Sequence, residues 1–100
     1  MIIENWTPHA VNCNGRIFEP CGKVVRVDME RSEKLQIGGI PCFSTRSTGV
    51  SNAPEKKNGV FYIVSALVRT ASGRDDFISP ADFVRDSSGN ITGCKSFDIN

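Results

Sequence analysis

The sequence predicts a mainly β protein, folded as a small antiparallel sheet or open barrel with one or two short helices. Two hairpin signals and one strongly apolar run lead to this prediction. The hairpin signals are Asn14-Gly15 and the loop 86–90, and the apolar run is Val60–Val64. A chain of 100 residues fits one domain, so residues 1–100 are expected to fold as a single unit.

The first hairpin is predicted around Asn14-Gly15, between the segments 11–13 and 16–18. Asn-Gly is the strongest short signal for a two-residue turn, because both of its residues must adopt positive φ. Such a turn sets Val11 opposite Phe18.

The next segments are increasingly polar. Residues 25–30 alternate apolar and charged side chains, which is typical of a half-buried strand with its charged side chains in water. Residues 31–36 support no prediction, and residues 40–43 indicate a short strand after Gly38-Gly39. Residues 44–59 are small and polar, and they predict a long loop that could include a short strand.

The run 60–64 predicts a central strand. Ser65 can then cap a short helix, 66–71, which Gly73 would close. The alternative is that the strand continues to Val68. The last hairpin is predicted between 83–85 and 91–94, with Gly89 left-handed in its turn. The expected core comprises Ile17, Phe18, Val25, Val27, Phe61, Ile63, Val64, Leu67, Val84 and Ile91.

Composition narrows the functional classes. The chain has 12 basic and 11 acidic residues, and a net charge of +1 argues against a broad nucleic-acid surface while leaving room for a small anion site.

Neither a signal peptide nor a membrane span is recognisable, so we expect a cytoplasmic protein with no membrane partner. The four cysteines have no metal-site spacing, and we expect them to be reduced, with a His9–Cys13 metal site as the weaker alternative.

Catalytic motifs are not recognisable, so the sequence predicts a protein that is not an enzyme and that needs no cofactor or metal. The single histidine, His9, follows Pro8 and is expected to be structural. Asp75 and Asp76 are adjacent, and in a strand they would point to opposite faces, which makes them a poor acid–base pair.

A binding role is better supported by residue type. Ser65 at a helix start would expose backbone N–H groups, and arginine is the side chain best shaped for phosphate. We therefore predict a phosphate-bearing small ligand bound by Ser65, Arg74 and Arg85, with Arg46 closing from the long loop. Aromatic side chains such as Trp6 could stack a base. The alternative is that the arginines pair with surface aspartates and the aromatic residues fill the core.

Several motifs also resemble those of a family of small phage and prophage proteins. The pattern of that family includes a Thr-Pro-His start, an Ile-Val-Ser strand end, an Arg-x-Asp turn before a proline, and a Val-Arg-Asp hairpin that ends in Gly-Cys. In this sequence the corresponding segments are 5–11, 18–27, 63–65, 74–76 with Pro80, 84–86 and 93–94. Trp6 and Cys21 depart from the pattern, and the middle segment, 31–59, matches it poorly.

The resemblance implies a phage origin rather than a defined activity. By analogy with other small phage proteins, we expect a sponge, meaning a homo-oligomeric protein that sequesters a nucleotide-type immune signal in the host cell cytoplasm. The alternative is a structural or host-protein-binding accessory protein, and a small hydrolase is the third hypothesis.

Overall fold

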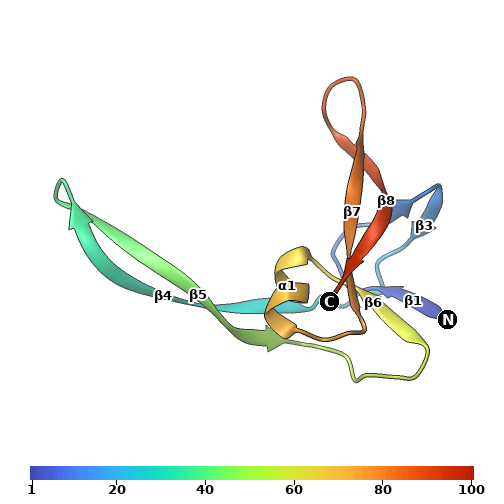
Figure 1. Cartoon of the computed structure of the whole chain (residues 1–100), viewed down its shortest axis with the longest axis horizontal. Coiled ribbons are helices and arrows are strands. Elements are labelled where there is room, and N and C mark those ends of the chain that lie inside the picture. Colours follow the sequence, from blue (N-terminus) through green and yellow to red (C-terminus); the bar gives the residue numbers. More distant parts are fainter.

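The computed structural model describes all residues, 1–100, and the prediction of a mainly β protein with one short helix is confirmed (Figure 1). The strands and the single helix, in chain order, are β1 (Ile2–Asn5), β2 (Val11–Cys13), β3 (Arg16–Phe18), β4 (Arg26–Ile37), β5 (Ile40–Ser51), β6 (Val60–Ile63), α1 (Ala66–Ser72), β7 (Phe77–Arg85) and β8 (Ile91–Ile99). No helix has the length and the apolar character that a membrane crossing requires.

Six strands form the body of the molecule, in the order β1-β6-β7-β8-β2-β3. The sheet is mixed, because β1–β6, β6–β7 and β8–β2 are parallel pairs whereas β7–β8 and β2–β3 are antiparallel. Its two edges almost meet, since Asn5 at the end of β1 forms a bridge with Pro20 after β3, and the Cys21 amide donates to the Asn5 carbonyl at 2.9 Å. The body is therefore a nearly closed, barrel-like sheet.

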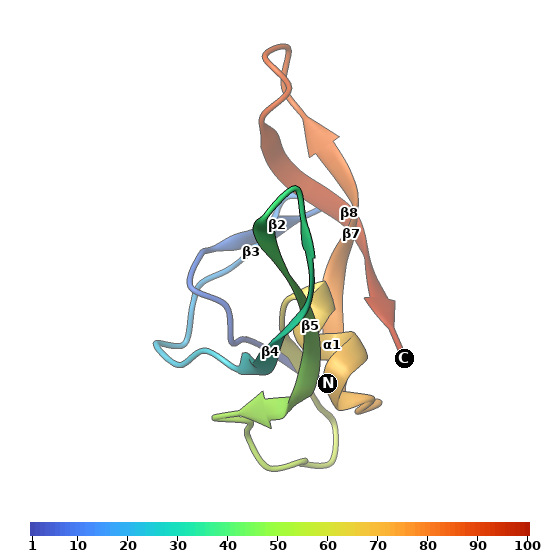
Figure 2. The same ribbon diagram turned by 90° about the vertical axis from the view of Figure 1, so that its left-hand side faces the viewer.

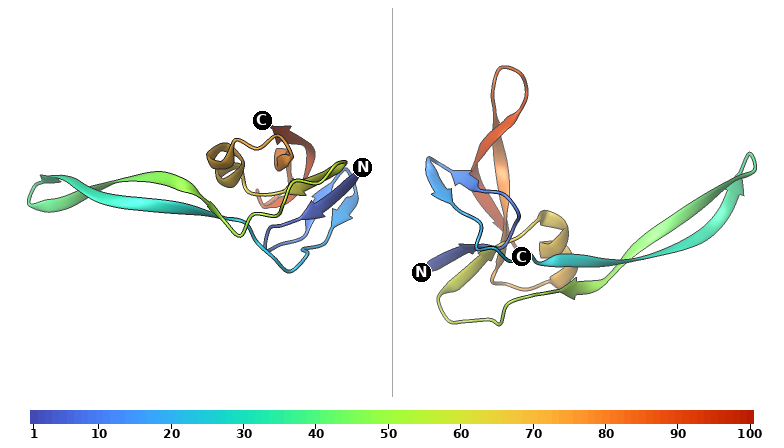
Figure 3. Two further views of the ribbon diagram at one scale, coloured as in Figure 1. Left: turned by 90° about the horizontal axis from the view of Figure 1, so that it is seen from below. Right: turned by 180° about the vertical axis from the view of Figure 1, so that it is seen from behind.

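The strands β4 and β5 form a separate antiparallel hairpin, residues 26–51, which we call the arm. Figures 1 and 3 show the arm leaving the body and extending far beyond it. Figure 2, which looks along the arm toward the body, shows the β7–β8 hairpin as a second, shorter projection. The molecule measures 51 × 39 × 23 Å as a result.

The core is small and lies between the sheet and α1. A cluster of five buried side chains, Val25, Tyr62, Val64, Val68 and Phe77, forms its centre. Only 11 of the 100 residues are buried. The radius of gyration is 16.4 Å, whereas a compact domain of this length has a radius of about 13 Å. Much of the chain therefore has few packing partners within one copy.

Both predicted hairpins and the predicted helix are present. The Asn14-Gly15 turn sets Val11 opposite Phe18, and both turn residues have positive φ, 54° and 82°. Ser65 caps α1 by accepting a hydrogen bond from the Val68 amide at 3.2 Å, and Gly73 closes the helix in the left-handed conformation. The alternative strand through Val68 is therefore wrong. The second turn places Gly89 at φ 84°.

The prediction of a long loop over residues 44–59 is wrong for its first half. Residues 44–51 belong to β5 and pair with β4, and only residues 52–59 connect β5 to β6. The segment is polar on both faces because both faces of the arm are largely exposed. Without an apolar face, the strand has no alternation for sequence analysis to detect.

The predicted core is correct only in part. Val25, Ile63 and Val64 are buried, and Phe18, Val27 and Phe61 are half-buried. Four predicted core residues are instead exposed, namely Ile17, Leu67, Val84 and Ile91. The helix buries Val68 rather than Leu67. The sequence did not identify this inner face because a helix of seven residues has too few turns to show an apolar periodicity.

Candidate functional site

A row of three aromatic side chains, with a cation at each end, crosses the body. The Trp6 ring stands edge-on to Tyr62 at 5.8 Å between centroids, and Tyr62 stands edge-on to Phe77 at 6.1 Å. The row ends in a cation on each side. Lys23 Nζ lies 5.8 Å from the Trp6 ring centre, and the Arg74 guanidinium lies 4.2 Å from the Phe77 ring centre. The inner rings are buried, so Trp6 is the aromatic group of this row that meets solvent.

Beside Trp6 the surface is hollowed, and we call this cavity the tryptophan hollow. Its volume is about 600 Å³. Its walls come from β1, β3 and the segment after β3, with Lys57 added from the loop before β6; the lining residues are Ile3, Glu4, Asn5, Trp6, Ile17, Phe18, Glu19, Cys21, Lys23 and Lys57. Small-molecule sites in proteins have volumes of roughly 300–1,000 Å³, so the hollow has a suitable size.

Asn5 holds the segment that carries Trp6. Its buried side-chain amide donates to the carbonyl oxygens of His9 and Phe18, both at 2.8 Å. Its Oδ1 accepts from the amide of Thr7 at 2.9 Å and from the Thr7 hydroxyl at 2.6 Å. One side chain thus pins the turn after β1 to the end of β3. The Thr-Pro-His motif is a structural element of this turn.

His9 takes part in this network only through its backbone. Its carbonyl oxygen accepts from Asn5 and, at 3.0 Å, from the Thr7 hydroxyl, whereas its imidazole is on an exposed residue and has no hydrogen bond. The structure thus gives the backbone of His9, and not its ring, a role in the turn at the base of the first hairpin.

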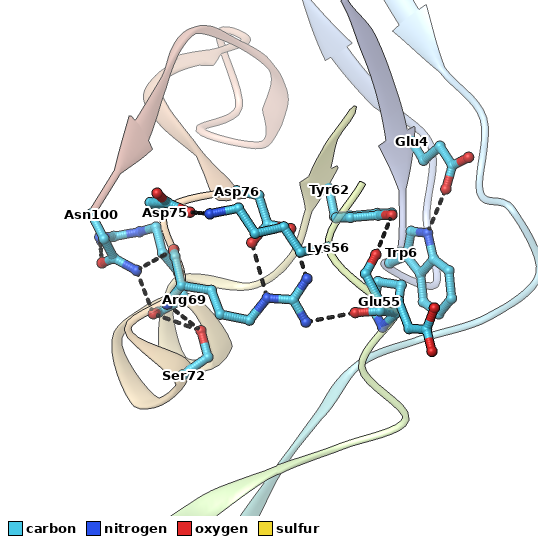
Figure 4. Close-up of polar contacts among 12 residues, drawn as sticks. Glu4, Trp6, Glu55, Lys56, Tyr62, Arg69, Ser72, Asp75, Asp76 and Asn100 are labelled. Carbon is cyan, nitrogen blue, oxygen red and sulfur yellow. Dashed lines mark hydrogen bonds and ion pairs between the residues drawn. The ribbon is translucent and has the colours of Figure 1, made fainter. Parts of the chain in front are cut away.

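The hollow contains both signs of charge, in different places. Glu4 accepts a hydrogen bond from the Trp6 indole N–H at 3.1 Å, which fixes the orientation of the ring (Figure 4). Lys23 and Lys57 form no salt bridge, so their ammonium groups are available to a ligand. An aromatic face next to two free cations can stack a planar ring and pair with an anion.

Behind Trp6, Tyr62 is buried and donates from its hydroxyl to the Glu55 carbonyl at 2.9 Å (Figure 4). Burial raises the pKa of Tyr62 above its ordinary value, and the nearby carboxylates of Glu4 and Asp76 raise it further. Tyr62 therefore stays neutral and acts as a rigid support for the tryptophan ring.

The four ligand-binding residues predicted from the sequence occupy different parts of the chain. Ser65 lines a smaller hollow of about 320 Å³, together with Thr7 and Arg26. Arg74 follows α1, where it donates to both carboxylate oxygens of Asp76, at 2.9 and 2.7 Å, and to the Pro54 carbonyl at 2.6 Å. Its guanidinium is thus already occupied by partners within the chain.

The other two arginines lie on the projections. Arg85 ends β7 and donates to the Gly89 carbonyl at 2.9 Å, within its own hairpin. Arg46 pairs with Glu30 across the middle of the arm at 2.8 Å. Only Ser65 among the four lines one of the five cavities described in the chain, and no cavity brings the four residues together in one copy.

Sequence reasoning did not single out Lys23 or Lys57. Trp6 was considered only as one of several aromatic residues, and no motif links it to a lysine 17 positions later or to one near residue 60. The two edges of a nearly closed sheet bring these positions together. Such nonlocal pairing has no signature in a single sequence.

A second cavity, of about 520 Å³, lies at the base of the β7–β8 projection. We call it the apolar hollow. Its lining includes no acidic residue, no lysine and no arginine. The lining residues are His9, Ala10, Val11, Asn12, Ile17, Pro80, Phe83, Ile91, Thr92, Gly93 and Cys94. Ile17, Phe83 and Ile91 are three of the exposed large apolar residues of the chain.

The four cysteines form no disulfide in the structure, and no cluster of three or more histidine, cysteine, aspartate or glutamate side chains is arranged to hold a metal ion. Comparison with family models, curated proteins and solved structures finds no match to this chain.

Proposed function

We propose that this chain is a phage-encoded, non-enzymatic protein that binds a phosphate-bearing, nucleotide-type small molecule and sequesters it in the host cytoplasm. The observation that supports the proposal is the tryptophan hollow, in which an aromatic face lies beside two lysines that form no salt bridge. A nucleotide offers the matching groups, a planar base for the ring and phosphate oxygens for the ammonium groups.

The roles of the lining residues follow from their positions. Trp6 supplies the stacking face, and its orientation is fixed by the hydrogen bond to Glu4 and by the perpendicular contact with Tyr62. Lys23 and Lys57 supply the anion contacts from opposite sides of the hollow's wall, one after β3 and one before β6. A fixed ring beside two lysines, with no catalytic group between them, suits capture of a ligand rather than its chemical conversion.

Trp6 is the only tryptophan, so its fluorescence reports on the hollow alone. The experiment titrates the protein with a panel of cyclic nucleotides and ADP-ribose-type nucleotides and follows tryptophan emission, with calorimetry for affinity. We expect quenching by at least one member of the panel. The ligand should be recovered unchanged after denaturation, which distinguishes sequestration from hydrolysis.

Three variants test the location. Lys23→Ala and Lys57→Ala should each weaken binding about 10- to 100-fold, because a hydrogen bond to a charged group is worth roughly 1.5–3 kcal/mol. Lys95→Ala on β8 is the matched control, since Lys95 does not line the hollow, and it should bind like the wild type. If the lysine variants bind normally, Arg46→Ala and Arg85→Ala test the site predicted from the sequence. If the wild type binds nothing in the panel, the proposal fails.

A structural or host-protein-binding accessory protein is the second candidate. The observation that favours it is the arm, whose surface is almost entirely exposed in one copy. This candidate takes precedence if the nucleotide titration shows no binding.

A further inference from the structure

The arm carries an apolar tip that has no partner. Leu35 pairs with Cys42 and Ile37 pairs with Ile40, so all four side chains share one face at the end of the hairpin. Leu35, Ile37 and Ile40 are 51%, 64% and 67% exposed. We call these four residues the arm tip. Clustered, exposed aliphatic side chains of this kind mark an interaction surface.

The arm as a whole lacks the support that a hairpin needs. A two-stranded hairpin alone is at best marginally stable in water, yet β4 and β5 extend for 12 residues each. Of residues 26–51, 22 are exposed, and a standard protein interface uses about 20–30 residues from each partner. The arm thus offers the surface of a full interface on an element that the body does not cover.

The apolar hollow has the complementary character. It is lined by no acidic side chain, lysine or arginine, and Phe83, Ile91 and Ile17 expose apolar surface there. The arm cannot fill the hollow of its own copy, because it leaves the body on the side opposite β2 and β3 (Figure 1). Each strand of the arm spans about 40 Å at roughly 3.3 Å per residue. The arm tip and the apolar hollow therefore cannot contact each other within one chain. The tip of one copy can contact the hollow of a second copy.

We propose that the arm tip of one copy docks into the apolar hollow of a second copy, so that the chain assembles with itself through head-to-tail contacts. Two different patches meet in such a contact, and repetition closes a ring if the rotation allows. The assembly would bury the exposed aliphatic residues of both surfaces. This inference does not depend on the nucleotide proposal, because neither patch includes Trp6, Lys23 or Lys57.

The test uses light scattering coupled to gel filtration over a range of concentrations. The wild type should be larger than one 10.9 kDa chain. Ile37→Asp at the tip and Phe83→Asp at the hollow should each give monomers. Leu67→Asp is the matched control, since Leu67 is 53% exposed on α1 but belongs to neither patch, and it should assemble like the wild type. Circular dichroism verifies that each variant is folded, and Ile91→Asp replaces Phe83→Asp if the latter is not.

Mixing the two variants separates this proposal from other kinds of self-association. Ile37→Asp keeps an intact hollow and Phe83→Asp keeps an intact tip, so an equimolar mixture should form a dimer of twice 10.9 kDa. Assembly of Phe83→Asp or Ile91→Asp alone, as would follow from tip-to-tip contact, overturns the proposal. So does a wild type that remains monomeric at every concentration, which would leave the tip to a different protein.

Discussion

Arg74 and Asp76 form a bidentate ion pair. Nε of Arg74 donates to Oδ1 of Asp76 at 2.9 Å, and Nη2 of Arg74 donates to Oδ2 of Asp76 at 2.7 Å. The Asp76 side chain is only 4% exposed and that of Arg74 is 26% exposed. Arg74→Ala should therefore lower the free energy of unfolding by roughly 2–4 kcal/mol, because it leaves a buried carboxylate without its partner. Arg85→Ala is the control and should change it by less than about 0.5 kcal/mol. Urea unfolding at pH 7 measures both.

The loss of stability caused by Arg74→Ala should depend on pH. The hydrogen bonds from Arg74 hold the pKa of Asp76 below its usual range, and they outweigh the opposing effect of burial. A carboxyl with a lower pKa in the folded state stabilises the fold above the unfolded-chain value of about 3.9 and loses that effect as the pH falls through the folded-state pKa. The difference between wild type and Arg74→Ala should thus shrink below about pH 4. A constant difference from pH 7 to pH 3 would contradict the assignment.

Tyr62 should make the fold sensitive to alkali. Its raised pKa means that the unfolded chain loses the tyrosine proton near pH 10 while the folded chain still holds it. Stability is therefore complete below about pH 10 and falls as the pH rises through the folded-state pKa. Tyr62 is the only tyrosine, so absorbance of the phenolate follows it directly. Tyr62→Phe should cost about 1 kcal/mol at neutral pH, through loss of the bond to Glu55, and should remove this part of the pH dependence.

The Asn5 side chain should contribute far more to the stability of the fold than the His9 side chain. Asn5→Ala removes four hydrogen bonds from a buried site and should cost about 3 kcal/mol, since the carbonyl and amide groups of the turn lose their partners. His9→Gln should change the free energy of unfolding by less than about 0.5 kcal/mol, because the imidazole is on an exposed residue and forms no hydrogen bond. Thermal unfolding of the two variants side by side would reveal the opposite order if the turn depended on the ring.

The cysteines should differ in reactivity. Burial raises the pKa of the Cys94 thiol, and its strand neighbour Cys13 adds to the effect, so little Cys94 thiolate forms at neutral pH. Cys21 is exposed. A thiol reagent should modify Cys21 first and Cys94 last, with rates about tenfold or more apart. The unfolded, unreduced protein should titrate as four free thiols; fewer than three would contradict the prediction of reduced cysteines.

The sequence was sufficient to predict the structure of elements that are determined by residues close together in the chain. Asn14-Gly15 predicts its hairpin and the Val11–Phe18 register, and Ser65 with Gly73 predicts both ends of α1. Prediction failed where distant segments decide the structure. Residues 44–51 become a strand only because β4 lies beside them, and the tryptophan hollow exists only because the edges of the sheet meet near Asn5 and Pro20.

The strand order also has a consequence for synthesis on the ribosome. β2 pairs with β8, so Cys13 emerges 81 residues before its partner Cys94 (94 − 13 = 81). At about 5–20 residues per second, β2 and β3 would wait roughly 4–16 s before the last strand is available. The first hairpin can form alone in that time, but it cannot be enclosed in the sheet. A ribosome that stalls before residue 91 would therefore leave the opening segment of the protein exposed to proteases and chaperones.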